Sequence, residues 1–217
     1  MTETAPADIP SRKQPRGTRR LQLIEATLDT LAEVGYARTT LTAVAKRAGL
    51  SHGLVNFHFQ TKERLLTETM LYLAEEYRAN WSAALEAAGT GAAARLNALL
   101  QADFNPAICT PARLSAWCSF WGEAQSRPLY QENCGSNDEA YNRTMEGVCA
   151  ALLSEGGYGG DPARIARVLR VTTEGVWLDL MTMVHPYERD EARATLMTCA
   201  AAFFPRHFCD RGLIQAT

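Results

Sequence analysis

Apolar residues recur at helical spacing from near the start of the chain. Leu21, Ile24, Leu28 and Leu31 are three or four residues apart, and the pattern stops at Gly35. Side chains at this spacing share one face of an α-helix. Glycine often follows the last residue of a helix because it adopts a left-handed conformation without strain. The pattern therefore predicts a first helix that starts at residue 18 and ends before Gly35.

Two short helices and a long one are predicted next. Thr39 or Thr40 can cap the segment LTAVAKRA, and Gly49 ends it after about two turns. Ser51 can cap HGLVNFHF, and Thr61 can cap a long helix that runs to residue 88. Two short helices joined by a tight glycine turn and braced by a preceding helix form a helix-turn-helix, whose second helix fits the DNA major groove.

The rest of the chain has helical patterns and no strand-like alternation. Prolines and a glycine-rich segment separate helices that we expect at about 92–104, 111–126, 128–154, 162–184 and 188–208. The predicted fold class is all-α. We divide the chain into a flexible basic arm (1–17), a three-helix helix-turn-helix DNA-binding domain (18–62) and a helical effector-binding and dimerisation domain (63–217).

Charge separates the predicted domains. The 217-residue chain has a net charge of −2, yet residues 11–62 contain nine Lys or Arg against three acids, a net of +6. The remainder must then carry −8. A basic module attached to an acidic body is typical of a polyanion-binding unit joined to a part with another task, although a solvated basic face is an alternative interpretation.

Several function classes have no support in the sequence. No apolar run is long enough to span a membrane and the first residues do not resemble a secretory signal, so we expect a cytoplasmic protein. The six cysteines form no C-x-x-C pair, and neither a zinc motif, a nucleophile elbow nor a phosphate loop is present. We therefore expect no metal, no cofactor and no enzymatic activity. A scaffold that binds DNA without sensing anything would not need the large acidic body.

The segment TTLTAVAKRAGLSHGLVNFHFQTKERLL (39–66) resembles the N-terminal signature of TetR-family repressors. The resemblance implies binding to double-stranded operator DNA. Asn56 stands where the family usually has tyrosine, and Arg64 replaces the acidic residue of the capping box. Carried over by position, with two arginines of the basic segment added, the predicted DNA-binding residues are Arg19, Arg20, Thr40, Thr42, Ser51, His52, Gly53, Asn56, His58 and Lys62.

Two later segments, LSAWCSFWGEAQSRPLYQ (114–131) and EGVWLDL (174–180), resemble the branch of this family that senses choline and represses glycine betaine synthesis. Aromatic faces attract quaternary ammonium groups, and Trp117 and Trp121 share a helix face. Glu174 or Asp179 could also supply counter-charge. Ordinary core aromatics, or a repressor of another pathway with an unrelated apolar or aromatic effector, are the alternatives. The predicted effector-binding residues are Trp117, Phe120, Trp121, Glu123, Tyr130 and Trp177.

We also expect a homodimer, because two recognition helices gain affinity and read a palindromic site. As in the resembled family, the last two helices are the predicted interface. The long helix that starts at Lys62 is the predicted lever between the two domains. The predicted interface residues are Val168, Val171, Leu196, Ala200 and Phe203.

Overall fold

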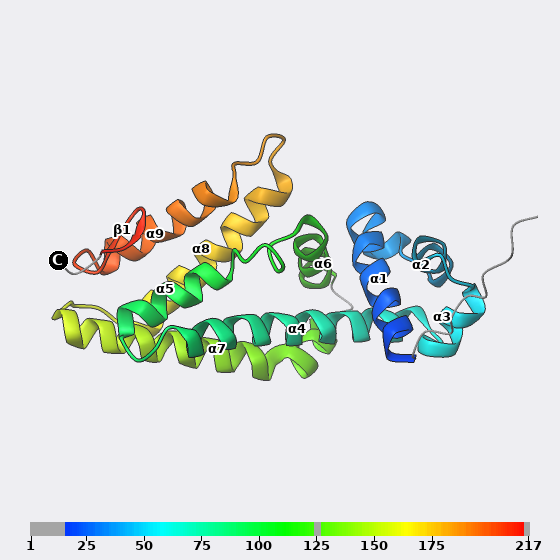
Figure 1. The fold of residues 1–217 in the computed structure, drawn as a ribbon, viewed down its shortest axis with the longest axis horizontal. Helices are drawn as coiled ribbons and strands as arrows, with labels where there is room; N and C mark the ends of the chain where they lie inside the picture. Colours follow the sequence, from blue (N-terminus) through cyan, green and yellow to red (C-terminus); the bar gives the residue numbers. More distant parts are fainter. Residues whose placement is uncertain (1–15, 124–126, 215–217) are drawn as a thin grey trace, which may run out of the picture.

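The computed structural model describes residues 16–123 and 127–214. The predicted basic arm (1–17) therefore lies outside the described residues, except for Arg16 and Gly17. These two residues already belong to the first turn of α1 (Arg16–Arg38). The molecule is elongated, with the N-terminal helices at one end and the body at the other (Figure 1).

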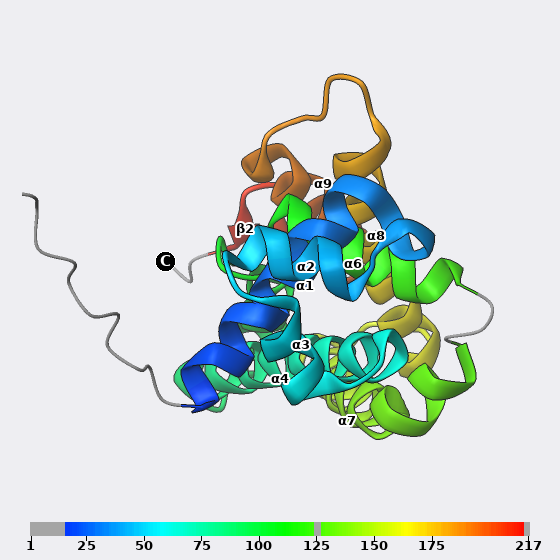
Figure 2. The same ribbon diagram turned by 90° about the vertical axis from the view of Figure 1, so that its right-hand side faces the viewer.

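The N-terminal end is a compact unit of α1, α2 (Leu41–Ala48) and α3 (His52–Phe59). Viewed from this end, α3 lies beside the start of α4 (Lys62–Ala87), with the body behind (Figure 2). One face of each short helix is buried in a common core. That core consists of Leu23, Ile24, Ala26, Val44, Ala45, Val55, Phe59 and Leu65.

The predicted caps are present in this unit. The hydroxyl oxygens of Thr40, Ser51 and Thr61 accept hydrogen bonds from the backbone N–H groups three residues later, at 3.1, 3.3 and 3.1 Å. Each such cap contributes about 1 kcal/mol. Gly49 has φ 65°, so it closes α2 in the left-handed conformation that a side chain disfavours. Gly35 has φ 75° and interrupts the helical geometry of α1, as the sequence predicts.

The body consists of the remainder of α4 and of α5 (Ala92–Ala102), α6 (Pro111–Gly122), α7 (Arg127–Gly156), α8 (Pro162–Thr182) and α9 (Arg189–Phe203). α4 runs from the N-terminal unit along α7, and α6 lies between the body and α1 (Figure 1). Pro111 and Pro162 occupy first-turn positions, where a missing N–H does no harm.

The predicted helix 188–208 is wrong at its C-terminal end. α9 stops at Phe203, because Pro205 disfavours helical geometry at Phe204 and cannot donate a backbone hydrogen bond. The chain continues into a short hairpin of β1 (Phe208–Cys209) and β2 (Gly212–Leu213). Phe208 is buried against the body, so this hairpin closes the end farthest from α3.

A separate core joins the N-terminal unit to the body. Residues of α1, α4, α6 and α7 pack there, and the rings of Trp117 and Phe120 are both almost fully buried among them. α1 contributes Leu28 and Leu31 to the same core. α6 is therefore in direct packing contact with both α1 and α4.

Candidate functional site

The N-terminal unit presents a polar face on α3 and beside it. Ser51, His52, Gly53 and Asn56 are exposed, and His58 is half-buried. Their donors and acceptors suit base edges and phosphates, and a glycine lets the DNA backbone approach closely. Thr40 and Thr42, at the start of α2, are also exposed. The predicted residues of α2 and α3 are thus accessible in the structure.

The predicted cationic contacts differ in their surroundings. The guanidinium of Arg20 forms an ion pair with Glu68 at 2.6 Å, and Arg19 donates to the side-chain oxygen of Gln22 at 2.9 Å. The ammonium group of Lys62 donates to the carbonyl oxygens of Tyr36 and Ala37 at 2.9 and 3.0 Å. Lys62 therefore stabilises the C-terminal end of α1 in addition to any contact with phosphate.

Phe57, which is absent from the predicted set, shares the outer side of α3. It is 62% exposed, and its ring lies edge-on to His58 with centroids 5.4 Å apart. An apolar side chain at this position can contact a thymine methyl group in the major groove. The sequence carried the signal, because Phe57 is out of phase with the inward-facing Val55 and Phe59.

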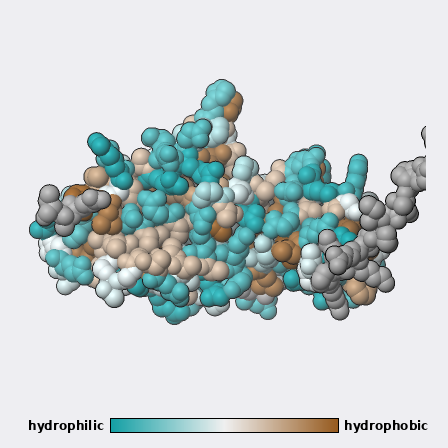
Figure 3. Space-filling model, viewed as in Figure 1, coloured by the Kyte–Doolittle hydropathy of each residue, from teal (hydrophilic) through white to brown (hydrophobic). Residues whose placement is uncertain are grey.

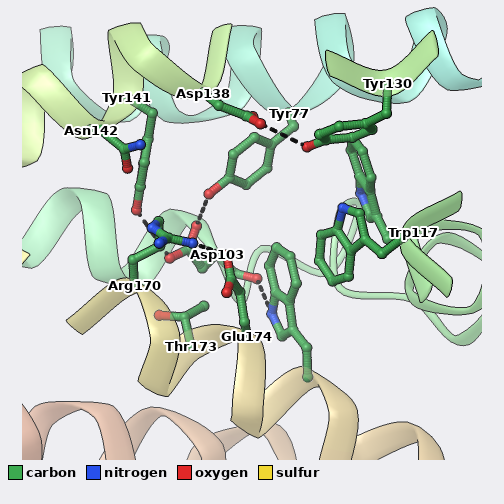
Figure 4. A pocket seen from close by; sticks show the side chains of 12 residues that line it. Tyr77, Asp103, Trp117, Tyr130, Asp138, Tyr141, Asn142, Arg170, Thr173 and Glu174 are labelled. Carbon is green, nitrogen blue, oxygen red and sulfur yellow. Dashed lines mark hydrogen bonds and ion pairs between the residues drawn. The ribbon is translucent and has the colours of Figure 1, made fainter. Parts of the chain in front are cut away.

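The body contains a cavity of about 450 Å³, within the range of roughly 300–1,000 Å³ typical of small-molecule sites. Side chains from α4, α6, α7, α8 and the segment after α5 point into it (Figure 4). The lining residues are Tyr77, Asp103, Trp117, Trp121, Tyr130, Asp138, Tyr141, Asn142, Arg170, Thr173, Glu174 and Trp177.

One end of the cavity is formed by the rings of α6 and α7. Trp117 and Trp121 stack with centroids 5.8 Å apart and an interplanar angle of 25°. Tyr130 meets Trp117 edge-on at 6.2 Å and donates its hydroxyl to Asp138 at 2.9 Å. Burial raises the pKa of both Tyr130 and Asp138. This end offers aromatic faces with a carboxyl group beside them.

The other end is more polar and more deeply buried. The Asp103 carboxyl accepts hydrogen bonds from the hydroxyls of Tyr77 and Tyr141 at 2.8 and 3.4 Å. Trp177 donates its indole N–H to the backbone carbonyl of Asp103 at 3.2 Å. Arg170 forms an ion pair with Glu174 at 2.5 Å. The cavity thus holds three carboxyl groups, those of Asp103, Asp138 and Glu174, against one guanidinium.

Four of the predicted effector residues, Trp117, Trp121, Tyr130 and Trp177, line the cavity, and the other two do not. Phe120 faces α1 instead, where its ring meets Tyr36 edge-on at 6.2 Å. Glu123 lies at the end of α6, and its charge adds to the effect of burial in raising the pKa of Tyr36. An α6 side chain at position 120 is rotated away from the face that carries Trp117 and Trp121.

Sequence reasoning missed most of the polar lining. Of the two acids predicted to supply counter-charge, Glu174 lies in the cavity. Asp179 lies outside it and accepts a hydrogen bond from Tyr187 at 3.3 Å. Asp103 and Tyr141 belong to segments with no distinctive motif. A weak signal existed for Asp103, because an acid directly after a helix lies at the unfavourable negative end of the helix dipole.

α6 connects the cavity to the N-terminal unit through a second group of polar residues. Arg113, one turn before Trp117, pairs with Glu76 of α4 through Nε at 2.6 Å and Nη2 at 2.7 Å. Its Nη2 also reaches Glu25 of α1 at 3.1 Å. Tyr72 donates its hydroxyl to Glu25 at 3.0 Å, and burial together with these acids raises the pKa of Tyr72 to about 12.

Two surfaces outside the cavity are apolar. A shallow groove between α4 and α5 is lined mainly by alanine side chains, with Glu76, Asn80, Gln101 and Asn105 among them, and a pale, weakly hydrophobic area covers this part of the body in Figure 3. On α8, Val168 and Val171 are 38% and 51% exposed. Leu196 and Ala200 are fully buried in the core of their own chain, so their prediction as dimer contacts is wrong.

No helix in the described ranges is long and apolar enough to cross a membrane.

Comparison with known proteins gives consistent matches along the chain. Residues 23–69 match the family described as bacterial regulatory proteins of the tetR family, and residues 92–205 match the BetI-type transcriptional repressor C-terminal domain. The HTH-type transcriptional regulator BetI of Klebsiella pneumoniae (strain 342) is 36% identical over 182 residues, which cover 81% of this chain and 89% of the relative.

Solved structures share the fold. A candidate transcriptional regulator from Pseudomonas aeruginosa PAO1 is 26% identical, with a TM-score of 0.74 over 89% of this chain and 93% of that chain. A candidate regulator from Saccharomonospora viridis, solved in complex with choline, is 19% identical, with a TM-score of 0.71 over 89% of this chain and 98% of that chain.

Proposed function

This chain belongs to the TetR family of DNA-binding repressors and has a BetI-type C-terminal domain, and from that premise we propose that choline or a related quaternary ammonium compound is its effector. As a TetR-type transcriptional repressor it is not an enzyme; it binds operator DNA and dimerises. Binding of the effector relieves repression of genes for glycine betaine synthesis or uptake.

The cavity carries this proposal because it combines aromatic faces with an excess of carboxyl groups. Each aromatic contact with a quaternary ammonium contributes roughly 0.5–2 kcal/mol, depending on desolvation. Six aromatic side chains line the cavity, and its three carboxyl groups outnumber the guanidinium of Arg170. Such a lining favours a cation over a neutral or anionic ligand. The fold can accommodate choline, as the choline complex of the Saccharomonospora viridis protein illustrates.

Relief of repression proceeds through α6. A ligand shifts a conformational equilibrium only by its differential affinity for the two states. Trp117 and Trp121 of α6 contact the ligand, while Arg113 of the same helix pairs with α1 and α4. A ligand that moves α6 therefore changes the position of α1 and of the start of α4, and with them the separation of two recognition helices in a dimer. The exposed valines of α8 support an interface between copies on that helix.

The alternative function is repression of another pathway with an unrelated apolar or aromatic effector. The stacked tryptophans would suit such a ligand. The buried carboxyl group of Asp103, whose side-chain donors are the neutral hydroxyls of Tyr77 and Tyr141, would then be left without a counter-charge. Charge is therefore the property that separates the two candidates.

The test compares choline with its uncharged carbon isostere, 3,3-dimethylbutan-1-ol, on the full-length protein. We expect choline to quench or shift tryptophan fluorescence and to weaken operator binding in a gel-shift assay, and the isostere to do neither at the same concentration. Trp121→Leu, which removes one aromatic face at a partly exposed position, should weaken the choline response and leave operator binding unchanged. Equal responses to choline and the isostere would support the alternative effector instead.

A further inference from the structure

We propose that Asp103 is the carboxylate that pairs with the cationic group of the effector, and that this pairing makes the response to effector weaken as the pH falls below neutrality. The proposal rests on the proposed function, since it assumes a cationic effector in the same cavity. It assigns the counter-charge to a side chain on the segment after α5, away from the paired tryptophans of α6.

The three cavity carboxyl groups are not equivalent. Glu174 is already neutralised by Arg170 at 2.5 Å. Asp138 lies nearer the surface than Asp103, and both the hydrogen bond from the Tyr130 hydroxyl at 2.9 Å and the charge of Arg170 favour its ionised form. Asp103 is 1% exposed, and within the described part of the chain no ion pair joins it to a basic side chain. Asp103 is therefore the cavity acid whose charge is both buried and uncompensated.

The immediate surroundings of Asp103 supply neutral donors and aromatic rings. Its carboxyl group accepts from Tyr77 and Tyr141, and its backbone carbonyl holds the indole of Trp177. Tyr77 lies edge-on to Trp177 at 6.0 Å and tilted against Tyr141 at 5.7 Å. Figure 4 shows the hydroxyl of Tyr77 directed at Asp103. A carboxylate set among three rings, and facing a cavity, is suited to a cation with apolar substituents.

The position of Asp103 makes its charge costly in the absence of such a cation. It directly follows the C-terminus of α5, where the helix dipole disfavours a negative charge. Burial raises the pKa of Asp103 to about 7, while hydrogen bonds from Tyr77, Tyr141 and Thr173 oppose that rise and the charge of Glu174 adds to it. The titratable and charged groups that face Asp103 are Tyr77 from α4, Asp138 and Tyr141 from α7, Arg170 and Glu174 from α8, and Cys109 from its own segment.

The sign of the pH effect follows from this position. Near pH 8 the carboxyl group is already ionised, so a cation binds without proton exchange. Near pH 6 it is mostly protonated, and the cation must displace that proton. For a pKa of about 7, the apparent affinity of the protein for the cation should be roughly tenfold lower at pH 6 than at pH 8. At pH 6, close to one proton should be released for each cation bound.

The experiment is calorimetric titration of choline into the full-length protein at pH 6 and pH 8, in buffers that differ in ionisation enthalpy. Wild type should show the tenfold loss and the proton release at pH 6. Asp103→Asn should bind choline at least tenfold more weakly at pH 8 and lose the pH dependence. Asp179→Asn, an exposed acid of α8 outside the cavity, is the matched control and should behave as wild type.

A second readout separates a binding role from a structural one. Because the folded-state pKa of Asp103 lies above its ordinary value, ionisation of this group destabilises the free protein above pH 7, and the cost shrinks as the pH falls. Asp103→Asn should therefore melt at a higher temperature than wild type at pH 8, with a smaller difference at pH 5. A merely structural carboxyl group would give a variant that is less stable at both pH values.

The outcomes distinguish the two proposals. If choline does not bind wild type at either pH, the proposed function fails. If choline binds wild type equally at both pH values, or if Asp103→Asn retains full affinity, this inference fails while the effector proposal stands. If Asp138→Asn rather than Asp103→Asn removes the pH dependence, the counter-charge belongs to the other end of the cavity and the assignment to Asp103 is wrong.

Discussion

The two ends of the molecule hold their polar groups in opposite ways. On α3, Ser51, His52 and Asn56 are exposed, and the fold beneath them rests on a separate apolar core. In the cavity, Asp103, Tyr141 and Trp177 are each at most 5% exposed and are part of the packing of the body. Substitutions of His52 or Asn56 on the DNA face should therefore change binding alone, whereas substitutions in the cavity change binding and folding together. Ser51 is the exception on the DNA face, because its hydroxyl also caps α3.

The largest difference should appear in stability. Trp177→Ala removes a ring that is 5% exposed and leaves a cavity, for which large aromatic residues typically cost about 3–5 kcal/mol. Asn56→Ala, at an exposed position of α3, should change the free energy of unfolding by less than about 0.5 kcal/mol. Denaturant unfolding of the two variants measures the contrast. A stability for Trp177→Ala within 0.5 kcal/mol of wild type would contradict the view that the cavity wall is core.

A second test addresses the connection between the two ends. Arg113→Met removes the side chain of α6 that pairs with Glu76 and Glu25, and Arg113 is only 16% exposed. We expect choline still to bind, but its effect on operator affinity to shrink by about 1–2 kcal/mol, or five- to thirtyfold, because coupling energies are of this size. Operator affinity measured with and without choline gives the coupling directly.

The control for that experiment is Arg78→Met. Arg78 pairs with Glu75 on the exposed side of α4 and makes no contact with α6 among the interactions of the described residues. It should leave the coupling unchanged. If Arg113→Met also leaves the coupling unchanged, the ion pairs only stabilise the junction, and transmission must depend on the apolar packing of Trp117 and its neighbours.

A third test compares two basic residues that were predicted to contact DNA in the same way. The ammonium of Lys62 also donates to two carbonyl oxygens at the end of α1. Among the described residues, the hydrogen bond of Arg19 is to the side chain of Gln22 on its own helix. Lys62→Met should therefore lower stability by roughly 1–2 kcal/mol. Arg19→Met should leave the free energy of unfolding unchanged. It should reduce the slope of log operator affinity against log salt concentration by about one, the value for one lost phosphate contact. Equal stability of the two variants would show that the capping role of Lys62 is negligible.

The contrast between the two ends also decides what could be predicted from the sequence. The caps at Ser51 and Thr61 and the turn at Gly49 depend on residues within four positions, so local patterns predicted them. For α2 the sequence left Thr39 and Thr40 as alternatives, and Thr40 is the cap. The residues of the DNA face on α2 and α3 were predicted by position from the resemblance to TetR-family repressors, and Phe57 was not among them. The cavity depends on contacts between segments far apart, such as Tyr77 with Asp103 and Asp103 with Trp177. Aromatic spacing predicted the tryptophans of α6, but no local pattern could place a tyrosine of α7 beside an acid that follows α5.

The smallest expected effect is the sharpest check on the DNA face, since it concerns a residue that the sequence pattern did not select. Phe57 is 62% exposed on the outer side of α3, next to Asn56. If its ring covers one thymine methyl group, Phe57→Ala should weaken operator binding by about 0.8 kcal/mol, roughly fourfold, because that is the value of one buried methyl-sized group. Phe57→Leu, which keeps an apolar contact, is the matched control and should retain most of the affinity. The loss should disappear on an operator in which uracil replaces thymine, because the missing methyl group leaves nothing for the ring to cover. A fourfold loss that persists on the uracil operator would instead assign Phe57 a role in orienting the neighbouring ring of His58.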